Sequence, residues 1–123
     1  MNYKIQCFYD LNAWKLGHDL VLKVYKTTKD FPKEELYGIV SQLRRASSSI
    51  TANIAEGFAR YHFNDKIRFY YQARGSAAEV QNFLLLAKDL NYIDKSLCND
   101  LFEIVKQTMQ LINGLIRSIE NQK

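Results

Sequence analysis

The segment that decides the fold is residues 39–57, which reads IVSQLRRASSSITANIAEG. Its apolar and small residues recur at alternating steps of four and three, the spacing of a helix that packs along a seam against other helices. The seam positions are Ile39, Leu43, Ala46, Ile50, Asn53 and Gly57. This spacing predicts a helix over approximately 37–59. Asn53 is expected to lie on its buried side, where a side-chain amide would fix the register between helices.

Three further segments show the same periodicity and predict helices over approximately 12–30, 65–90 and 94–120. The three stripes consist of Ala13, Leu20, Val24 and Phe31; of Tyr70, Ala73, Ala77, Val80, Leu84 and Ala87; and of Leu97, Leu101, Ile104, Thr108, Leu111 and Leu115. The short joints between the segments force neighbouring helices to lie antiparallel. The predicted fold class is therefore all-α, an antiparallel up-down-up-down four-helix bundle.

Punctuating residues mark the ends of these segments. Pro32 disfavours helical geometry in the residue before it, so the first helix should stop there. Asn64 and Asp94 are candidate N-caps for the third and fourth helices, and Asn91 can adopt the left-handed conformation that closes the third. With 123 residues, the chain accommodates a single domain over 1–123, in which 1–10 is an extension before the first helix.

The charge balance is mildly basic. Seventeen Lys and Arg residues against thirteen Asp and Glu give a net charge of +4, which permits an anionic partner without requiring one. The N-terminus lacks the apolar region of a signal peptide, and no apolar run approaches the roughly 20 residues of a membrane span. We therefore expect a cytoplasmic protein with no membrane partner. Cys7 and Cys98 are expected to be free thiols, and a single disulfide is the alternative.

The segment 46–55, ASSSITANIA, carries no charge. The outer face of a surface helix normally turns Lys and Glu to water, yet the positions beside this seam are all small. Either the helix is central and its siblings cover it, or another subunit packs on it, and we favour the second interpretation. The candidate interface or structural polar residues are Gln42, Ser48, Ala52, Asn53, Ala55, Glu56, Arg74 and Glu79. The alternative for the charged members is a solvated surface.

No catalytic constellation is evident in the sequence. Neither His18 nor His62 follows a Glu by three residues, as a di-iron bundle requires, and no phosphate-cradling glycine loop is present. We therefore expect no enzymatic activity, no metal and no cofactor. An RNA-cutting enzyme that uses His62 is retained only as a remote alternative.

Nucleic-acid binding has more support. Basic residues around the start of the third helix alternate with aromatic ones over 60–71, a combination that suits phosphates beside stacked bases. The candidate nucleic-acid-binding residues are Arg44, Arg45, Arg60, Lys66 and Arg68. The alternative is that Phe69 and Tyr70 belong to the core and Lys66 is an ordinary surface residue. Oligomerisation would multiply the charge, to about +20 for five copies.

The sequence also carries recognisable motifs. They include Gln42-Leu43-Arg44-Arg45-Ala46, Asn53-Ile54-Ala55-Glu56-Gly57, Ala73-Arg74-Gly75-Ser76 and Tyr92-Ile93. From Asp10 onward the chain resembles the four-helix proteins encoded in intervening sequences of bacterial 23S rRNA genes. It departs from the family pattern at Thr51, where Pro is usual, and at Asn91, where Gly is usual. Thr51 in place of Pro is expected to straighten the second helix.

The resemblance implies a bundle that assembles into a ring-like homopentamer and has no catalytic activity. It also implies kinship with accessory proteins of diversity-generating retroelements, which bind a reverse transcriptase and nucleic acid. Residues that match the polar part of the motif are Gln42, Arg44, Arg45, Asn53, Glu56, Arg74 and Glu79. The sequence therefore favours a homo-oligomeric RNA-binding or ribonucleoprotein accessory protein. A protein–protein adaptor with no nucleic-acid role is the alternative.

Overall fold

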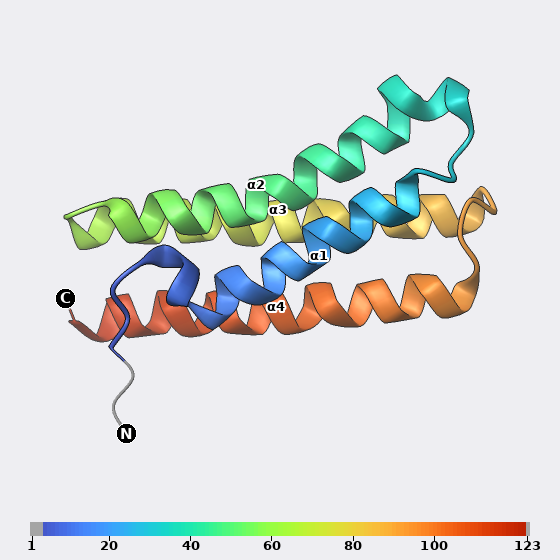
Figure 1. Ribbon diagram of the computed structural model, residues 1–123. Helices are drawn as coiled ribbons and strands as arrows, with labels where there is room; N and C mark the ends of the chain where they lie inside the picture. Colours follow the sequence, from blue (N-terminus) through green and yellow to red (C-terminus); the bar gives the residue numbers. More distant parts are fainter. Residues whose placement is uncertain (1–3, 123) are drawn as a thin grey trace.

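The protein folds into four antiparallel helices, described over residues 4–122 by a computed structural model (Figure 1). The helices are α1 (Asn12–Thr28), α2 (Ser41–Ala59), α3 (Phe63–Asp89) and α4 (Lys95–Gln122). Each helix packs against the next one and α1 also packs against α4, with the most extensive contacts between α2 and α3. Figure 1 shows α1 running at an angle to α3 and α4. The predicted all-α four-helix bundle is confirmed.

The first two helices begin or end differently from the prediction. Helix α1 stops at Thr28, before the predicted residue 30; the buried Thr28 hydroxyl donates to the Val24 carbonyl oxygen at 2.8 Å. Helix α2 becomes regular only at Ser41, because a 3₁₀ turn (Lys33–Glu35) and a wide helical turn (Leu36–Val40) precede it. Gly38 leaves helical geometry within that wide turn, with φ −107° and ψ −117°.

The ends of α3 and α4 show which caps were predicted correctly. Asn91 has φ 63°, and the Tyr92 N–H donates to the Ala87 carbonyl oxygen at 2.9 Å, as in a Schellman motif. The Asp94 carboxylate accepts a bond of 2.7 Å from the Leu97 N–H and caps α4. The Asn64 cap was wrong, because α3 already begins at Phe63 and His62 stands before it without a side-chain cap bond.

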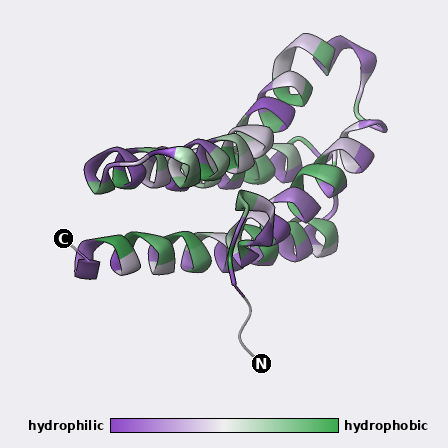
Figure 2. Ribbon diagram, turned by 60° about the vertical axis from the view of Figure 1, so that its left-hand side comes forward, coloured by the Kyte–Doolittle hydropathy of each residue, from purple (hydrophilic) through white to green (hydrophobic). Residues whose placement is uncertain are grey.

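The core follows the predicted stripes in α1 and α3, whose stripe residues are all buried. In α2 the seam is shifted, since Ile54 and Ser47 are fully buried while Asn53 is only half-buried. In α4 it is rotated, and the buried residues are Cys98, Leu101, Val105, Thr108, Ile112 and Ile116. Figure 2 shows the hydrophobic residues gathered where the helices face one another.

The reason for both shifts is that α2 and α4 each carry an apolar stripe wider than one seam. The neighbouring helices decide which part of such a stripe is covered. Leu97, Ile104 and Leu115 therefore remain half-buried on the flank of α4, and Leu111 is exposed.

The predicted extension 1–10 lies partly outside the described residues, since residues 1–3 are not described. A 3₁₀ turn (Phe8–Asp10) leads into α1, and the Asp10 carboxylate accepts bonds from the Gln6 and Cys7 N–H groups. These bonds lower the pKa of Asp10. Over residues 4–122, no helix has the length and apolar character needed to cross a membrane.

Candidate nucleic-acid interface

The five basic residues predicted to bind nucleic acid fall into two groups at opposite ends of α2. Arg44 and Arg45 lie in its first turns, whereas Arg60 follows its last residue and Lys66 and Arg68 lie in the first turns of α3. At 1.5 Å per residue, Arg44 and Arg60 are about 24 Å apart along the helix axis. The structure therefore does not bring the five residues into one patch.

Lys66 at the α2–α3 turn has a structural contact. Its Nζ donates to the carbonyl oxygens of Phe58 at 2.8 Å and Gly57 at 3.4 Å. These carbonyls end α2, where a cation interacts favourably with the helix dipole. Burial lowers the pKa of Lys66. The side chain caps α2 from α3, so it is neither a free ammonium for phosphate nor an ordinary surface lysine.

The two arginines of this turn are also occupied. The guanidinium carbons of Arg60 and Arg68 lie 4.7 and 5.0 Å from the centre of the Phe69 ring. Arg60 forms an ion pair with Glu56 at 3.2 Å, and Arg68 forms one with Asp65 at 3.7 Å. The two guanidinium groups therefore cover Phe69, one of the aromatic residues over 60–71 considered for base stacking.

The aromatic residues of this turn divide between core and surface. Tyr70 is 3% exposed, and burial raises its pKa to about 12. Tyr61 is 89% exposed, and its ring meets that of His62 edge-on with 5.2 Å between the centroids. Of the aromatic residues in this stretch, Tyr61 is thus the one most open to a base.

At the other end of α2, two adjacent arginines have different environments. Arg44 is half-buried: its Nε donates to Thr28 Oγ1 at 2.9 Å, and its guanidinium carbon lies 4.7 Å from the centre of the Tyr25 ring. Arg45 follows about 100° further round the helix and is exposed. Among residues 4–122, neither arginine has a carboxylate within ion-pair distance.

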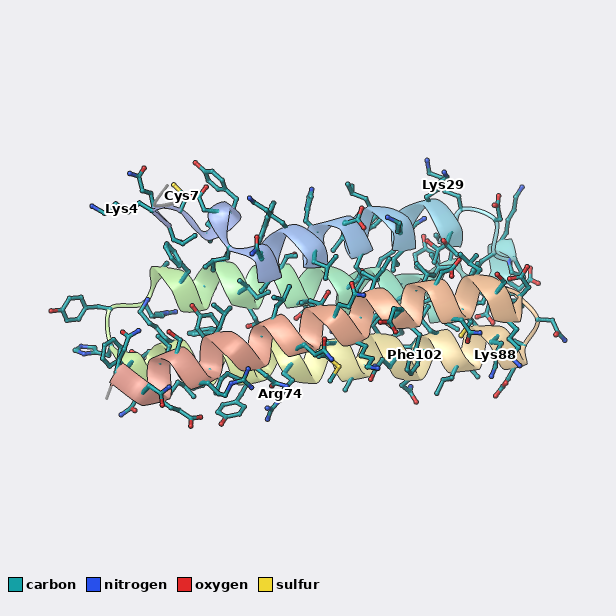
Figure 3. All side chains as sticks on the ribbon, turned by 90° about the horizontal axis from the view of Figure 1, so that it is seen from below. Lys4, Cys7, Lys29, Arg74, Lys88 and Phe102 are labelled. Carbon is teal, nitrogen blue, oxygen red and sulfur yellow. The ribbon has the colours of Figure 1, made fainter. Side chains whose placement is uncertain are left out.

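Further exposed cations, which are not among the five predicted residues, lie near this end of α2. Lys29 and Lys33 share a surface with Arg44, whereas Lys26 lines a different surface together with Asp100 of α4. All three lysines are exposed and make no ion pair within the described chain. Figure 3 shows Lys29 projecting from the end of α1. The available signal was the three-residue spacing of Lys23, Lys26 and Lys29. The contact between α1 and α2 that places Lys29 beside Arg44 was not visible in the sequence.

Acidic and aromatic residues share the same junction. Asp30, Glu34 and Glu35 lie within it, and the Glu35 carboxylate accepts a bond of 2.8 Å from the Tyr92 hydroxyl. Tyr37 is 92% exposed. The junction therefore combines unpaired cations with an open ring, while the nearby carboxylates reduce its net charge.

Arg74 connects two helices. Its Nη1 donates to Asn113 Oδ1 of α4 at 2.9 Å, and its guanidinium carbon lies 4.7 Å from the centre of the Tyr71 ring (Figure 3). Asn113 was missed, because nothing in its local sequence marks it as a partner. This contact supports a structural role for Arg74.

Another polar link joins α2 to α3. Asn53 Nδ2 donates to the Ser49 carbonyl oxygen at 2.9 Å and lies 3.1 Å from Ser49 Oγ, which accepts a bond of 3.0 Å from Ser76 Oγ. The contacts of Asn53 thus remain within α2, contrary to the expected register-fixing role. Ser49 and Ser76 make the contact between the helices.

The small-residue face of α2 is partly open in the single chain. Ser48 and Ala55 are half-buried and Ala52 is exposed. Gln42 and Glu79 are half-buried and make no side-chain hydrogen bond within residues 4–122. Helix α2 runs unbroken through Thr51, whose hydroxyl donates to the Ser48 carbonyl oxygen at 3.0 Å.

The described chain contains two free cysteines, the half-buried Cys7 and the buried Cys98. Within residues 4–122, no group of three or more His, Cys, Asp or Glu side chains is placed to hold a metal ion. The expectation of a protein without metal or cofactor remains a prediction.

Comparison with known proteins places this geometry in a family. A sequence model described as 23S rRNA-intervening sequence protein matches residues 9–114. The chain belongs to this family. A crystal structure of a protein of unknown function from the S23 ribosomal protein family of Bacteroides thetaiotaomicron has a similar fold, with a TM-score of 0.79 at 20% identity. The similarity covers 85% of this chain and 95% of that one. No match was found among curated proteins.

Membership in the 23S rRNA-intervening sequence protein family agrees with the motifs read from the sequence. The matched range contains α1, α2 and α3 entirely and most of α4. Both groups of basic residues at the ends of α2 lie within it.

Proposed function

We propose that this 23S rRNA-intervening sequence protein is a non-enzymatic, homo-oligomeric bundle, pentameric in its assembled form, that acts in the cytoplasm. It binds RNA, or a ribonucleoprotein such as a reverse transcriptase complex, through the α1–α2 junction. The observation that supports this most directly is that Lys29, Lys33, Arg44 and Arg45 have no ion-pair partner in the described chain.

An unpaired cation is better suited to phosphate than a paired one, because binding does not first require breaking an internal contact. The cations at the α2–α3 turn are already engaged by Glu56, Asp65 and the carbonyls of α2. The exposed ring of Tyr37 offers a surface on which a base can stack.

Oligomerisation belongs to the same proposal. Asp30, Glu34 and Glu35 weaken the field of one junction, so a single copy should bind RNA weakly. Several junctions on one assembly would contact one RNA together, and their effective concentration would raise the apparent affinity. The small, charge-free face of α2 around Ala52 is the surface on which we expect copies to meet.

The test is fluorescence anisotropy with structured and single-stranded RNA across a salt series. Arg45→Gln should weaken binding, and it should reduce the salt slope by about 0.7–0.9 for each copy that contacts RNA. Arg68→Gln is the matched control: it removes the same charge from a residue already paired with Asp65. Binding that is absent at low salt, indifferent to salt, or equally weakened by both variants would contradict the proposal.

A second candidate is a protein–protein adaptor, in which the positive charge is incidental. It is favoured by three leucines at the end of α3 that are 42–44% exposed: Leu85 and Leu86 in the helix and Leu90 directly after it. A single protein partner that survives nuclease treatment, and is lost in Leu86→Glu, would favour the adaptor over RNA binding.

A further inference from the structure

A cavity of about 370 Å³ lies at the corner where α1 ends and α2 begins. Its size falls in the range of small-molecule pockets, roughly 300–1,000 Å³. Three cationic side chains line it, those of Lys29, Lys33 and Arg44, and no carboxylate does. The cavity is formed within one chain, so its use requires neither nucleic acid nor a second copy.

The guanidinium of Arg44 is held in place before any ligand arrives. The Thr28 hydroxyl donates to the Val24 carbonyl oxygen and accepts from Arg44 Nε, at 2.8 and 2.9 Å. Thr28 is 3% exposed, so this anchor is shielded from water. The Tyr25 ring, 4.7 Å from the guanidinium carbon, fixes the plane of the group. Arg44 therefore loses little conformational freedom on binding.

The two Nη groups of Arg44 remain available. They make no hydrogen bond within the described chain. Every fully buried side-chain nitrogen or oxygen in residues 4–122 has a hydrogen-bond partner. Because the two Nη groups have none, they are in contact with solvent, and Arg44 is one of the residues that line the cavity. Two parallel N–H donors on a planar group match two oxygens of a phosphate or carboxylate.

Apart from Thr28, the rest of the lining is apolar and consists of Phe31, Pro32, Leu36 and Val40. Leu36 is 47% exposed, which leaves apolar surface uncovered beside the cations. Of the three carboxylates at the junction, Glu35 is engaged by the Tyr92 hydroxyl, whereas Asp30 and Glu34 are exposed and do not line the cavity. The cavity thus offers donors and apolar surface, without a charged acceptor.

We propose that this cavity binds a small organic phosphate monoester. Arg44, Lys29 and Lys33 hold the phosphate, and the apolar or aromatic body packs against Phe31, Leu36 and Val40. Three cations without a carboxylate favour a phosphate monoester, with its charge of about −1.5 to −2, over a carboxylate monoanion. This inference goes beyond the proposed function, because the ligand is a small molecule held by one chain.

The test is titration of the full-length protein with phenyl phosphate, followed by backbone amide shifts in NMR. We expect saturable binding with a Kd on the order of 1 mM, as befits a ligand of this size. Inorganic phosphate, benzyl alcohol and benzoate should each bind several-fold more weakly, since each lacks part of the recognised group. Equal binding of inorganic phosphate and phenyl phosphate would overturn the role of the apolar lining.

Variants locate the site. Arg44→Gln should weaken phenyl phosphate binding about tenfold or more, whereas Arg45→Gln, which removes the same charge one residue away, should change it less than about twofold. Because Arg44 also packs on Thr28 and Tyr25, the double variant Lys29→Gln/Lys33→Gln provides a second test at exposed positions and should weaken binding several-fold.

Three results would overturn the proposal: no saturable binding at millimolar phenyl phosphate, equal losses in Arg44→Gln and Arg45→Gln, or an unaltered Kd in the lysine double variant. Because the titration contains no nucleic acid, its failure leaves RNA binding untouched. Conversely, loss of the RNA proposal in the salt series leaves this titration valid.

Discussion

A single methyl group placed at Gly57 tests how closely α2 and α3 approach. Gly57 is buried near the end of α2. A Cβ there would lie 2.7 and 2.9 Å from two carbons of the Tyr70 ring and 3.2 Å from the Lys66 carbonyl oxygen. Tyr70 is 3% exposed and has little room to move. Gly57→Ala must therefore force the two helices apart or displace the ring.

The magnitude follows from two opposing effects. Overpacking a filled site costs about 1–3 kcal/mol, while replacing Gly by Ala in a helix gains up to about 1 kcal/mol. The gain is smaller in a last turn, so Gly57→Ala should lower the free energy of unfolding by about 1–2 kcal/mol. For a chain of this length, each kcal/mol shifts the Tm by about 4 °C. The expected fall in Tm is thus about 4–8 °C.

Gly75→Ala is the matched control. Gly75 lies within α3, and a Cβ there would meet no atom within 4 Å. The same substitution should therefore raise the free energy of unfolding by about 0.5–1 kcal/mol. Thermal and urea unfolding, followed by circular dichroism at one fixed protein concentration, measure both variants.

A Gly57→Ala protein at least as stable as the wild type would refute the close approach of α2 and α3. A Gly75→Ala protein that is destabilised would instead mean that position 75 is covered by something outside the single chain. A second copy would be distinguished by a loss that grows with protein concentration.

Three other substitutions test separate features. Asn91→Ala should lower the free energy of unfolding by about 1 kcal/mol, because the alanine side chain is strained at φ 63°, whereas Asn91→Gly should leave it nearly unchanged. The midpoints of urea unfolding measure both variants. Burial raises the pKa of Tyr70 from 10.0 to about 12, so the stability contributed by the protonated Tyr70 is complete below pH 10 and is lost as the pH rises through 12. The loss of stability at alkaline pH should therefore be smaller in Tyr70→Phe. Tyrosinate absorbance and unfolding across this pH range measure it. Ala52→Glu should shift sedimentation toward monomers with helicity retained, because the new charge would have to be desolvated at the proposed contact between copies. Since Ala52 is exposed in the single chain, unchanged sedimentation would contradict that contact.

The sequence predicted best where each local signal pointed the same way. Helix α3 is an example: its stripe from Tyr70 to Ala87 is fully buried, and it closes at Asn91 in the left-handed conformation. Helix periodicity and capping depend on residues within a few positions of one another, so a single sequence reports them directly.

Predictions failed where the answer depended on a neighbouring helix. Asn53 and Ile54 both fit a seam on α2, and the contacts with α1 and α3 determine that Ile54 is the buried one. Likewise, nothing in the sequence between Phe58 and Lys66 indicates that the Lys66 ammonium on α3 caps the end of α2. Periodicity places a residue on a face of its own helix but does not say what lies opposite.

The pair Arg44-Arg45 shows the same limit at the candidate site. In the sequence the two form one basic element, but a rotation of about 100° round the helix separates the Arg44 guanidinium, anchored on Thr28 and Tyr25, from the exposed Arg45. A double substitution would therefore mix two effects, the loss of a preorganised anion donor in a cavity and the loss of a surface charge. Single substitutions keep them apart. Sensitivity of phenyl phosphate binding to Arg44 alone, with RNA binding sensitive to Arg45, would establish two anion-binding functions at one corner of the bundle.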